Sequence, residues 1–274
     1  GSIDEFKIYN YAMQEEEVEK EFRESKQKKL LIHYEFEDNT QDTSGNLNHA
    51  VNHNVNFEEG LLGKAGRFDG DTSWLNTSFE IPESLTISMW MNLDTWKDLE
   101  NQYSSHHLYS YTNETMSDGL GIATDNNYWS TWIKTDTRHA LTSVHNHKLG
   151  EWHNIVTSYD RISGKHKLYV DGAYITSRTH NKGTKINYAD GYEYRMSLQH
   201  YNTNGLIDEF KIWDHELTHQ EILSEYTKLK PKQQIVHYEF KDLINDSGKY
   251  GKNLTNHNAV INNGKIGKSA WFNG

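Results

Sequence analysis

The chain has 274 residues and a net charge of −11, from 28 basic and 39 acidic side chains, with no cysteine and only two prolines. This length predicts one large domain or two small ones. The lack of cysteine excludes disulfide scaffolds, thiolate zinc sites and cysteine nucleophiles. The acidic balance argues against nucleic acid as a partner, because phosphate binding needs clustered Lys and Arg. Insertion into a membrane is not expected, since no apolar run approaches ~20 residues.

A motif at the start of the chain returns near its end. Residues 1–8 read GSIDEFKI and residues 205–212 read GLIDEFKI, 204 positions later. The same offset relates HYEF at 33–36 to HYEF at 237–240, GLLGK at 60–64 to GKIGK at 264–268, and FDG at 68–70 to FNG at 272–274. One offset shared by four motifs predicts a tandem repeat with a unit of about 204 residues.

This repeat divides the chain into three predicted parts. Residues 1–30 are the closing strand, helix and linker of a preceding repeat, residues 31–234 are a complete unit, and residues 235–274 are the opening strands of a following repeat. Neither end piece could bury its apolar face alone. We therefore expect a longer tandem array, or ends that are completed by neighbouring copies. The alternative is an arbitrary boundary without structural meaning.

The complete unit has the pattern of an all-β protein. Alternating or β-branched runs bounded by Gly and Asn turns predict strands at 85–91, 152–159, 166–170, 173–176 and 207–213. In the last of these, simple alternation places Ile207, Glu209, Lys211 and Trp213 on one face, and Asp208, Phe210 and Ile212 on the other.

One clear helix follows the closing strand. Thr218 and Glu221 have the spacing of a capping box, and Ile222, Leu223 and Tyr226 then form an apolar stripe. The matching segment at the front, residues 14–22, keeps the stripe but has no Ser or Thr at its start.

Several motifs in residues 31–228 together resemble one known family. They are Tyr34–Glu37 with Asp42–Asn46, Gly63–Gly70, Leu85–Met91, Gly150–Val156 with Leu168–Gly172, and Gly205–Ile212. The unit resembles the concanavalin A-like lectin/glucanase superfamily, in its laminin G-like (pentraxin-like) branch. This resemblance implies an antiparallel jelly-roll β-sandwich with a short helix after the closing strand. It leaves the function open, because the fold hosts lectins, adhesion modules, structural repeats and hydrolases.

The same resemblance implies a structural calcium ion near the first and last strands. The matching positions are Asp42 and Asp208, with Glu37 as a third candidate ligand. In the other copies, Asp246 corresponds to Asp42 and Asp4 to Asp208, whereas Lys241 stands at the position of Glu37. The alternative is that Asp42 only caps its own turn.

Aromatic residues in the middle of the unit suggest carbohydrate. Trp and Tyr rings stack on sugars while Asn and His bond the hydroxyl groups, and the predicted contact residues are Tyr128, Trp129, Trp132, His106 and Asn126. The alternative is that these rings belong to the core, as we expect for Trp90, Trp152 and Trp213.

No pattern indicates catalysis. Hydrolysis of a glycosidic bond needs two carboxylates that flank it, but Asp208 and Glu209 are adjacent in a strand and should face opposite ways. We therefore expect no enzyme, and no cofactor beyond the calcium ion. The leading hypothesis is a non-catalytic module of an extracellular or cell-surface adhesin or fibre-like polymer, which assembles end to end with neighbouring repeats or copies. A lectin module attached to an enzyme, binding glycans, is the alternative, and a glycoside hydrolase or lyase is the third reading.

Overall fold

The computed structural model describes residues 1–3, 6–25, 28–95, 105–112, 119–125, 128–136, 138–143, 148–187, 193–197, 203–230, 240, 255, 259–263 and 268–272. The chain divides into two compact units, Gly1–Leu229 and Lys230–Gly274.

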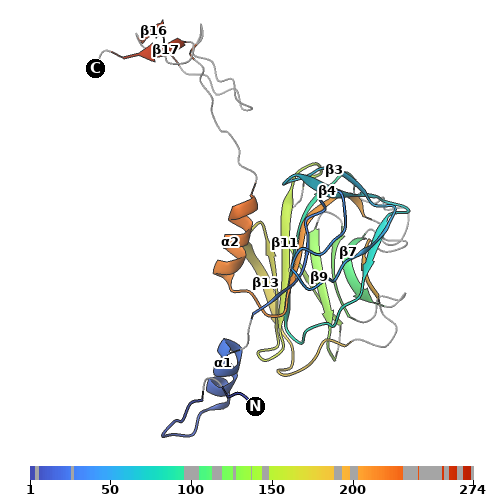
Figure 1. The fold of residues 1–274 in the computed structure, drawn as a ribbon, viewed down its shortest axis with the longest axis vertical. Helices are drawn as coiled ribbons and strands as arrows, with labels where there is room; N and C mark the ends of the chain where they lie inside the picture. The colour runs from blue at the N-terminus through green and yellow to red at the C-terminus, as the bar shows by residue number, and fades with distance from the viewer. Residues whose placement is uncertain are drawn as a thin grey trace. The chain divides into compact units, whose positions relative to one another are not determined.

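Two antiparallel sheets form the sandwich of the first unit, as predicted (Figure 1). Among the described residues the larger sheet has eight strands in the order β13-β12-β11-β6-β15-β4-β3, with β1 also paired to β15. Their bounds are β13 (Ala173–Thr179), β12 (Lys165–Val170), β11 (His153–Asp160), β6 (Leu85–Leu93), β15 (Asn204–Trp213), β4 (Lys64–Asp69), β3 (Asn56–Glu59) and β1 (Leu30–Tyr34).

The smaller sheet has seven strands within the described ranges, in the order β10-β9-β8-β7-β14-β5-β2. Their bounds are β10 (Arg138–Thr142), β9 (Tyr128–Lys134), β8 (Leu120–Asp125), β7 (Ser105–Thr112), β14 (Glu193–Met196), β5 (Trp74–Thr77) and β2 (Val51–His53). The core lies between the two sheets and takes Phe68, Ile87 and Phe210 from the larger sheet and Ile122 and Trp129 from the smaller one.

Helix α2 (His219–Leu229) covers part of the outer face of the larger sheet (Figure 1). Its Ile222 is buried against Val156 and Tyr169 of that face, and the rings of Tyr226 and Trp90 stack with centroids 5.4 Å apart. The predicted capping box is confirmed, since Glu221 N–H donates to Thr218 Oγ1 (3.2 Å) and Thr218 N–H donates to Glu221 Oε2 (2.7 Å).

Strand β15 departs from the predicted alternation. Ile207, Phe210 and Ile212 all belong to the core, although simple alternation placed Ile207 opposite the other two. The cause is an irregularity between Asp208 and Lys211 in the pairing of β15 with β6, where Glu209 has φ +50°. It separates the part of β15 that pairs with β4 from the part that pairs with β1.

The two ends of the chain contain elements at positions related by the 204-residue offset. Helix α1 spans Glu15–Ser25, and α2 spans His219–Leu229. In the second unit, β16 (Val260–Asn263) and β17 (Lys268–Trp271) form a hairpin with the register of β3 and β4. No helix in the described part of the chain is long and apolar enough to cross a membrane.

Candidate functional site

The outer face of the smaller sheet presents a row of half-buried polar and aromatic side chains. In β5, Leu75 and Thr77 are buried, so alternation turns Trp74 and Asn76 outward. Outward-facing residues of the two neighbouring strands, His53 of β2 and Arg195 of β14, meet them. We call these four residues the Trp74 cluster.

The Trp74 indole is held by contacts with His53 and Arg195. The His53 ring stacks on it with centroids 3.7 Å apart and planes 5° apart, and Arg195 Cζ lies 4.5 Å from the indole centroid. A hydrogen bond of 3.1 Å joins His53 Nε2 to Asn76 Oδ1. Stacking and cation–π contacts of this kind fix side-chain orientation, so the cluster is a preformed platform with polar groups beside an aromatic edge.

A second aromatic group lies on β9, near the other edge of this sheet. Tyr128 is 38% exposed. Trp132 lies at an alternate position of β9, on the same face as Tyr128, but is buried. Its ring covers Gly121 of β8 so closely that a Cβ added to Gly121 would lie 2.1 Å from the ring. The prediction that Trp132 contacts a ligand is therefore wrong for this structure, because its ring is packed onto the sheet.

Trp129 is also misassigned as a ligand contact. Its side chain lies on the opposite face of β9 from Tyr128 and is 1% exposed, in the core with Ile133. The core alternative is the right one for this residue. His106 lies in β7 with its backbone opposite Thr124, but its side chain, like Asn126, lies outside what the structure describes. Of the predicted contact residues, Tyr128 keeps its place on the surface.

Asp208, a predicted calcium ligand, is fully buried and holds a loop. Its carboxylate accepts hydrogen bonds from the amides of Leu61 (2.9 Å), Leu62 (3.1 Å) and Glu209 (2.8 Å). Burial, together with the charge of Glu209, raises the pKa of Asp208 to about 7 despite these amides. Asp208 thereby ties the β3–β4 loop to the irregular point of β15.

The other two predicted calcium ligands also serve backbone amides. Asp42 accepts from the amides of His33, Ser44 and Asn48 at 2.9–3.0 Å, and these bonds lower its pKa although burial opposes them. Glu37 accepts from the Lys64 amide at 3.0 Å. Among the described residues, these three carboxylates do not form a group whose ligand atoms all lie within 4.8 Å of one another. Calcium binding itself stays a prediction, which thermal melts with Ca²⁺ and with EDTA would check.

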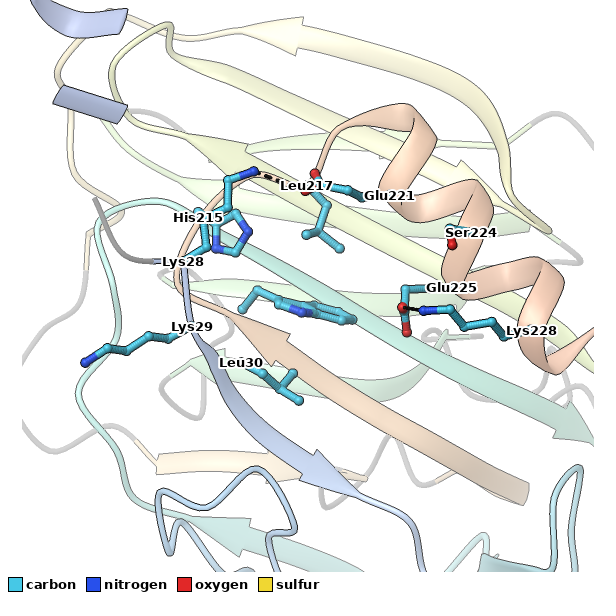
Figure 2. Close-up of a pocket in the computed structure, with 10 residues that line it drawn as sticks. Lys28, Lys29, Leu30, His215, Leu217, Glu221, Ser224, Glu225 and Lys228 are labelled. Atoms are coloured by element: carbon cyan, nitrogen blue, oxygen red, sulfur yellow. Dashed lines mark hydrogen bonds and ion pairs between the residues drawn. The ribbon is translucent and has the colours of Figure 1, made fainter. Parts of the chain in front are cut away.

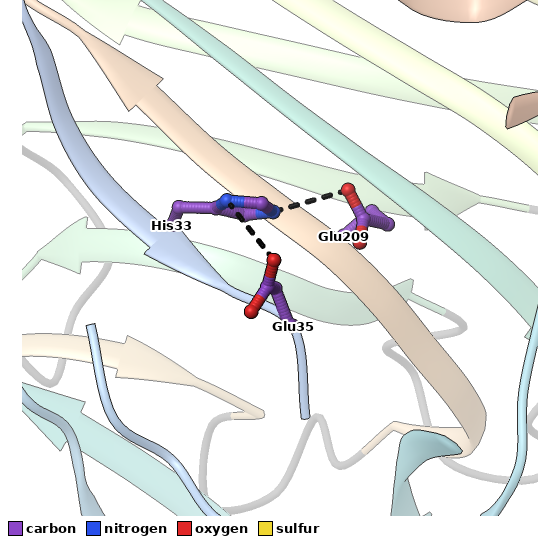
Figure 3. A group of neighbouring side chains, drawn as sticks. All are labelled: His33, Glu35 and Glu209. Carbon is purple, nitrogen blue, oxygen red and sulfur yellow. Dashed lines mark hydrogen bonds and ion pairs between the residues drawn. The ribbon is translucent and has the colours of Figure 1, made fainter. Parts of the chain in front are cut away.

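The structure does bring together another trio, His33, Glu35 and Glu209, which is drawn in Figure 3. His33 Nε2 lies 3.0 Å from Glu209 Oε2, and His33 Nδ1 lies 3.9 Å from Glu35 Oε1. One ligating atom from each lies within 4.8 Å of the others. Lys211 Nζ, however, lies 2.9 Å from the same Glu209 oxygen. A metal ion would have to compete with this ammonium group.

Lys211 extends the trio into a charge network that reaches α2. It lies 3.3 Å from Glu225 Oε2, and Glu225 also pairs with Lys228. Burial alone would raise the pKa of Glu209, but the hydrogen bond with His33 and the charge of Lys211 outweigh it and lower that pKa. The network therefore links β1, β15 and α2.

A cavity of about 350 Å³ lies beside this network, and Figure 2 shows its lining. The chain enters the sandwich along it at Lys28–Leu30 and leaves along it through α2. Trp213 and Leu217 supply its apolar wall, and Lys28 pairs with Glu221 across it at 3.1 Å.

A sequence profile of the family described as "Concanavalin A-like lectin/glucanases superfamily" matches residues 68–223, more than half of the chain. No curated protein matches in sequence. Among solved structures, the binding domain of Paraclostridial Mosquitocidal Protein 1 is similar at a TM-score of 0.63 and 16% identity, covering 73% of this chain and 52% of that one.

Two further structures share the fold. Domain 4 of AbnA, a GH43 extracellular arabinanase from Geobacillus stearothermophilus in complex with arabinotriose, has a TM-score of 0.61 and 17% identity over 73% of this chain and 98% of its own. The binding domain of Botulinum Neurotoxin DC in complex with SialylT has 0.58 and 16%, over 76% and 53%. The chain thus spans about half the length of the two toxin domains. By its sequence profile and its sandwich, the chain belongs to the concanavalin A-like lectin/glucanase superfamily.

Proposed function

We propose that this chain is a non-catalytic carbohydrate-binding module that uses the outer face of its smaller sheet. The observation that carries the proposal is the Trp74 cluster, a rigid aromatic and polar platform on that face. Helix α2 covers part of the outer face of the larger sheet. We therefore place the binding site on the outer face of the smaller sheet.

The chemistry of the face suits a sugar. An indole edge and a tyrosine ring offer apolar contact to the C–H faces of a sugar, while an imidazole, an amide and a guanidinium offer donors and acceptors for hydroxyl groups. Two of the structures with this fold, the arabinanase domain and the neurotoxin binding domain, are complexes with glycans. These complexes support the proposal.

The absence of a catalytic role is part of the proposal. A glycosidase needs two accessible carboxylates on either side of the bond. Asp208 and Glu209 are both buried and bonded to different partners, the first to loop amides and the second to His33 and Lys211. We expect no hydrolysis of any polysaccharide, and incubation with a panel of polysaccharides followed by a reducing-sugar assay checks this.

The test of the binding face compares Trp74 with an aromatic residue on the other sheet. Trp74→Ala should weaken glycan binding on an array or in calorimetry at least about five-fold, since losing the contact with the indole edge removes about 1 kcal/mol or more. Tyr174→Ala, at an exposed position on the edge strand β13 of the other sheet, is the matched control and should bind like the wild type. Equal binding by both variants, with folding confirmed by circular dichroism, would refute the assigned face.

The location and wider role of the module follow from a second observation. Elements at the two ends of the chain repeat those of the sandwich at an offset of 204 residues, which favours a repeat unit of an extracellular or cell-surface adhesin or fibre. If so, the sequence that flanks this stretch contains further copies at the same spacing. A flanking catalytic domain would instead favour a lectin module attached to an enzyme.

A further inference from the structure

The hydrogen-bonding groups of the Trp74 cluster are unbalanced. The side chains of Arg195 and Trp74 carry N–H donors and no oxygen or nitrogen acceptor. Asn76 does have an acceptor, its Oδ1, but this atom already lies 3.1 Å from His53 Nε2. Because an amide oxygen can only accept, Nε2 is the nitrogen that carries the proton in this pair. The cluster is therefore rich in donors and poor in acceptors.

Strand pairing brings two of these donor groups to one place. Arg195 of β14 lies directly opposite Asn76 of β5, and Trp74 lies two residues along the same strand. Tyr194 and Met196 are buried, so alternation turns Arg195 outward. The side chains of directly paired residues begin about 5 Å apart. One bound group can therefore reach the Asn76 amide and the guanidinium together.

The guanidinium of Arg195 is oriented by the indole. Its Cζ lies 4.5 Å from the centroid of the Trp74 ring, so the guanidinium lies over that ring. The N–H groups of a guanidinium form a planar fork that matches the two oxygens of a carboxylate. A carboxylate only accepts hydrogen bonds, whereas a sugar hydroxyl also needs an acceptor for its own proton. The cluster therefore suits a carboxylate better than a hydroxyl.

The charge of this face agrees with that reading. Among the described side chains that face outward from the strands of the smaller sheet, Arg195 and Lys134 carry a full charge, and both are basic. The chain as a whole has a net charge of −11. This overall charge repels an acidic ligand. A preference for an acidic sugar would therefore have to come from local basic groups, which are screened less at contact distance.

We propose that the glycan bound by this face is acidic, and that its carboxylate is bound by Arg195 and Asn76 beside the edge of Trp74. The inference rests on the proposed function and names the class of glycan for the same site. Uronic acids and sialic acids both carry a carboxylate of this kind. The probes below distinguish these two sources.

The test measures binding to two matched pairs of ligands by calorimetry. Polygalacturonate is compared with its methyl-esterified form, and sialyllactose with lactose. EDTA is present throughout, so that divalent ions cannot bridge two acidic partners. The acidic member of at least one pair should bind at least about ten-fold more tightly than the neutral member, because hydrogen bonds to charged groups are the stronger ones. The pair that shows the preference identifies the source of the carboxylate.

Three variants then locate the preference. Arg195→Gln removes the charge and should reduce the ratio of acidic to neutral binding to about one. Arg195→Lys keeps the charge but loses the planar fork, so it should leave an intermediate ratio. Arg178→Gln removes the same charge at an exposed position of the edge strand β13 in the other sheet. It is the matched control and should keep the ratio of the wild type. Circular dichroism confirms that each variant is folded.

The outcomes separate this inference from the proposed function. A wild-type ratio near one in both pairs, or no binding to either acidic ligand, would overturn the acidic class. Equal effects of Arg195→Gln and Arg178→Gln would also overturn it, because the preference would then follow the overall charge. If neutral glycans bind and Trp74→Ala weakens them while the ratio stays near one, the binding face stands and the acidic class fails. If Trp74→Ala binds all glycans like the wild type, the binding face itself fails.

Discussion

Two segments with closely related sequences, residues 205–229 and residues 1–25, differ in structure. The helices have equivalent bounds, Glu15–Ser25 and His219–Leu229. The strands do not match, because 205–212 lies within β15 whereas the described residues of 1–8 belong to no strand. A helix makes its hydrogen bonds within itself, but a strand needs a neighbouring strand. The helix is therefore determined by its own local sequence, whereas the strand depends on the sheet around it.

The largest difference between the two regions should come from one pair of phenylalanines. Phe210→Ala removes a fully buried ring that stacks on Tyr34 at 5.7 Å, and should lower the free energy of unfolding by about 3–5 kcal/mol. Phe6→Ala, at the exposed equivalent position, should change it by less than about 0.5 kcal/mol. Urea unfolding of both variants measures this. A cost of several kcal/mol for Phe6→Ala would mean that the segment is already covered in solution.

A second comparison uses the repeated lysine. Lys211→Ala leaves the buried carboxylate of Glu209 without its ammonium partner and should cost about 3 kcal/mol. Lys7→Ala breaks a pair whose side chains are both more than a third exposed, and should cost at most about 0.5 kcal/mol. Equal losses in denaturant titrations would contradict the difference in burial.

Histidine titration should affect the stability of the sandwich but not that of the terminal segment, because residues 1–25 contain no histidine. His166 is fully buried next to His180, and burial, helped by the charges of His180 and His139, lowers its pKa to about 3. The unfolded chain therefore binds this proton more readily, so its contribution to stability is complete above about pH 6.5 and is lost as the pH falls toward 3.

The contribution of His166 to stability should fall by about 2 kcal/mol between pH 7.5 and 4.5, whereas the raised pKa of Asp208 makes its protonation favour the folded state over the same range. Denaturant titrations of the wild type and of His166→Gln, which cannot titrate, at both pH values isolate the His166 contribution as the difference between the two changes in stability. A wild-type slope that survives this substitution would assign the pH dependence to other groups.

The smallest effect concerns the helix caps. Thr218→Ala removes the side chain that caps α2 and should cost about 1 kcal/mol. At the start of α1 the backbone N–H of Gln14 donates to Glu17 Oε2 at 2.8 Å, so half of the capping box is present. Gln14→Thr should supply the other half and slow amide hydrogen exchange in the first turn of α1 a few-fold. Unchanged exchange would mean that the first turn is limited by something other than its cap.

The strands of the sandwich could be predicted because their signals are local. In the run from Leu85 to Met91, apolar residues alternate with polar ones or follow one another directly. The Asp171-Gly172 turn predicts the hairpin of β12 and β13. The cap at Thr218 is equally local. Each of these features depends on residues that are close in sequence.

The candidate site could not be predicted in the same way. The Trp74 cluster joins three strands from positions 53, 74–76 and 195, and its only local signal is the polar–apolar alternation of β5. Trp132 was expected on the surface, but its burial depends on Gly121, a small residue of the neighbouring strand. The irregularity at Glu209 arises where β15 changes partner from β4 to β1, which no pattern within 207–213 reveals.

The pairing of Leu30 with Trp213 sets how the sandwich should respond to force. The chain enters β1 at the residue that lies opposite the last residue of β15. Tension applied through the two ends would first pull α2 from the sheet and then open the β1–β15 ladder at this end pair. The hydrogen bonds of the ladder would break one after another, as in a zipper, and would not resist together in shear. The unit should therefore release its first strand at low force while the rest of the core still holds.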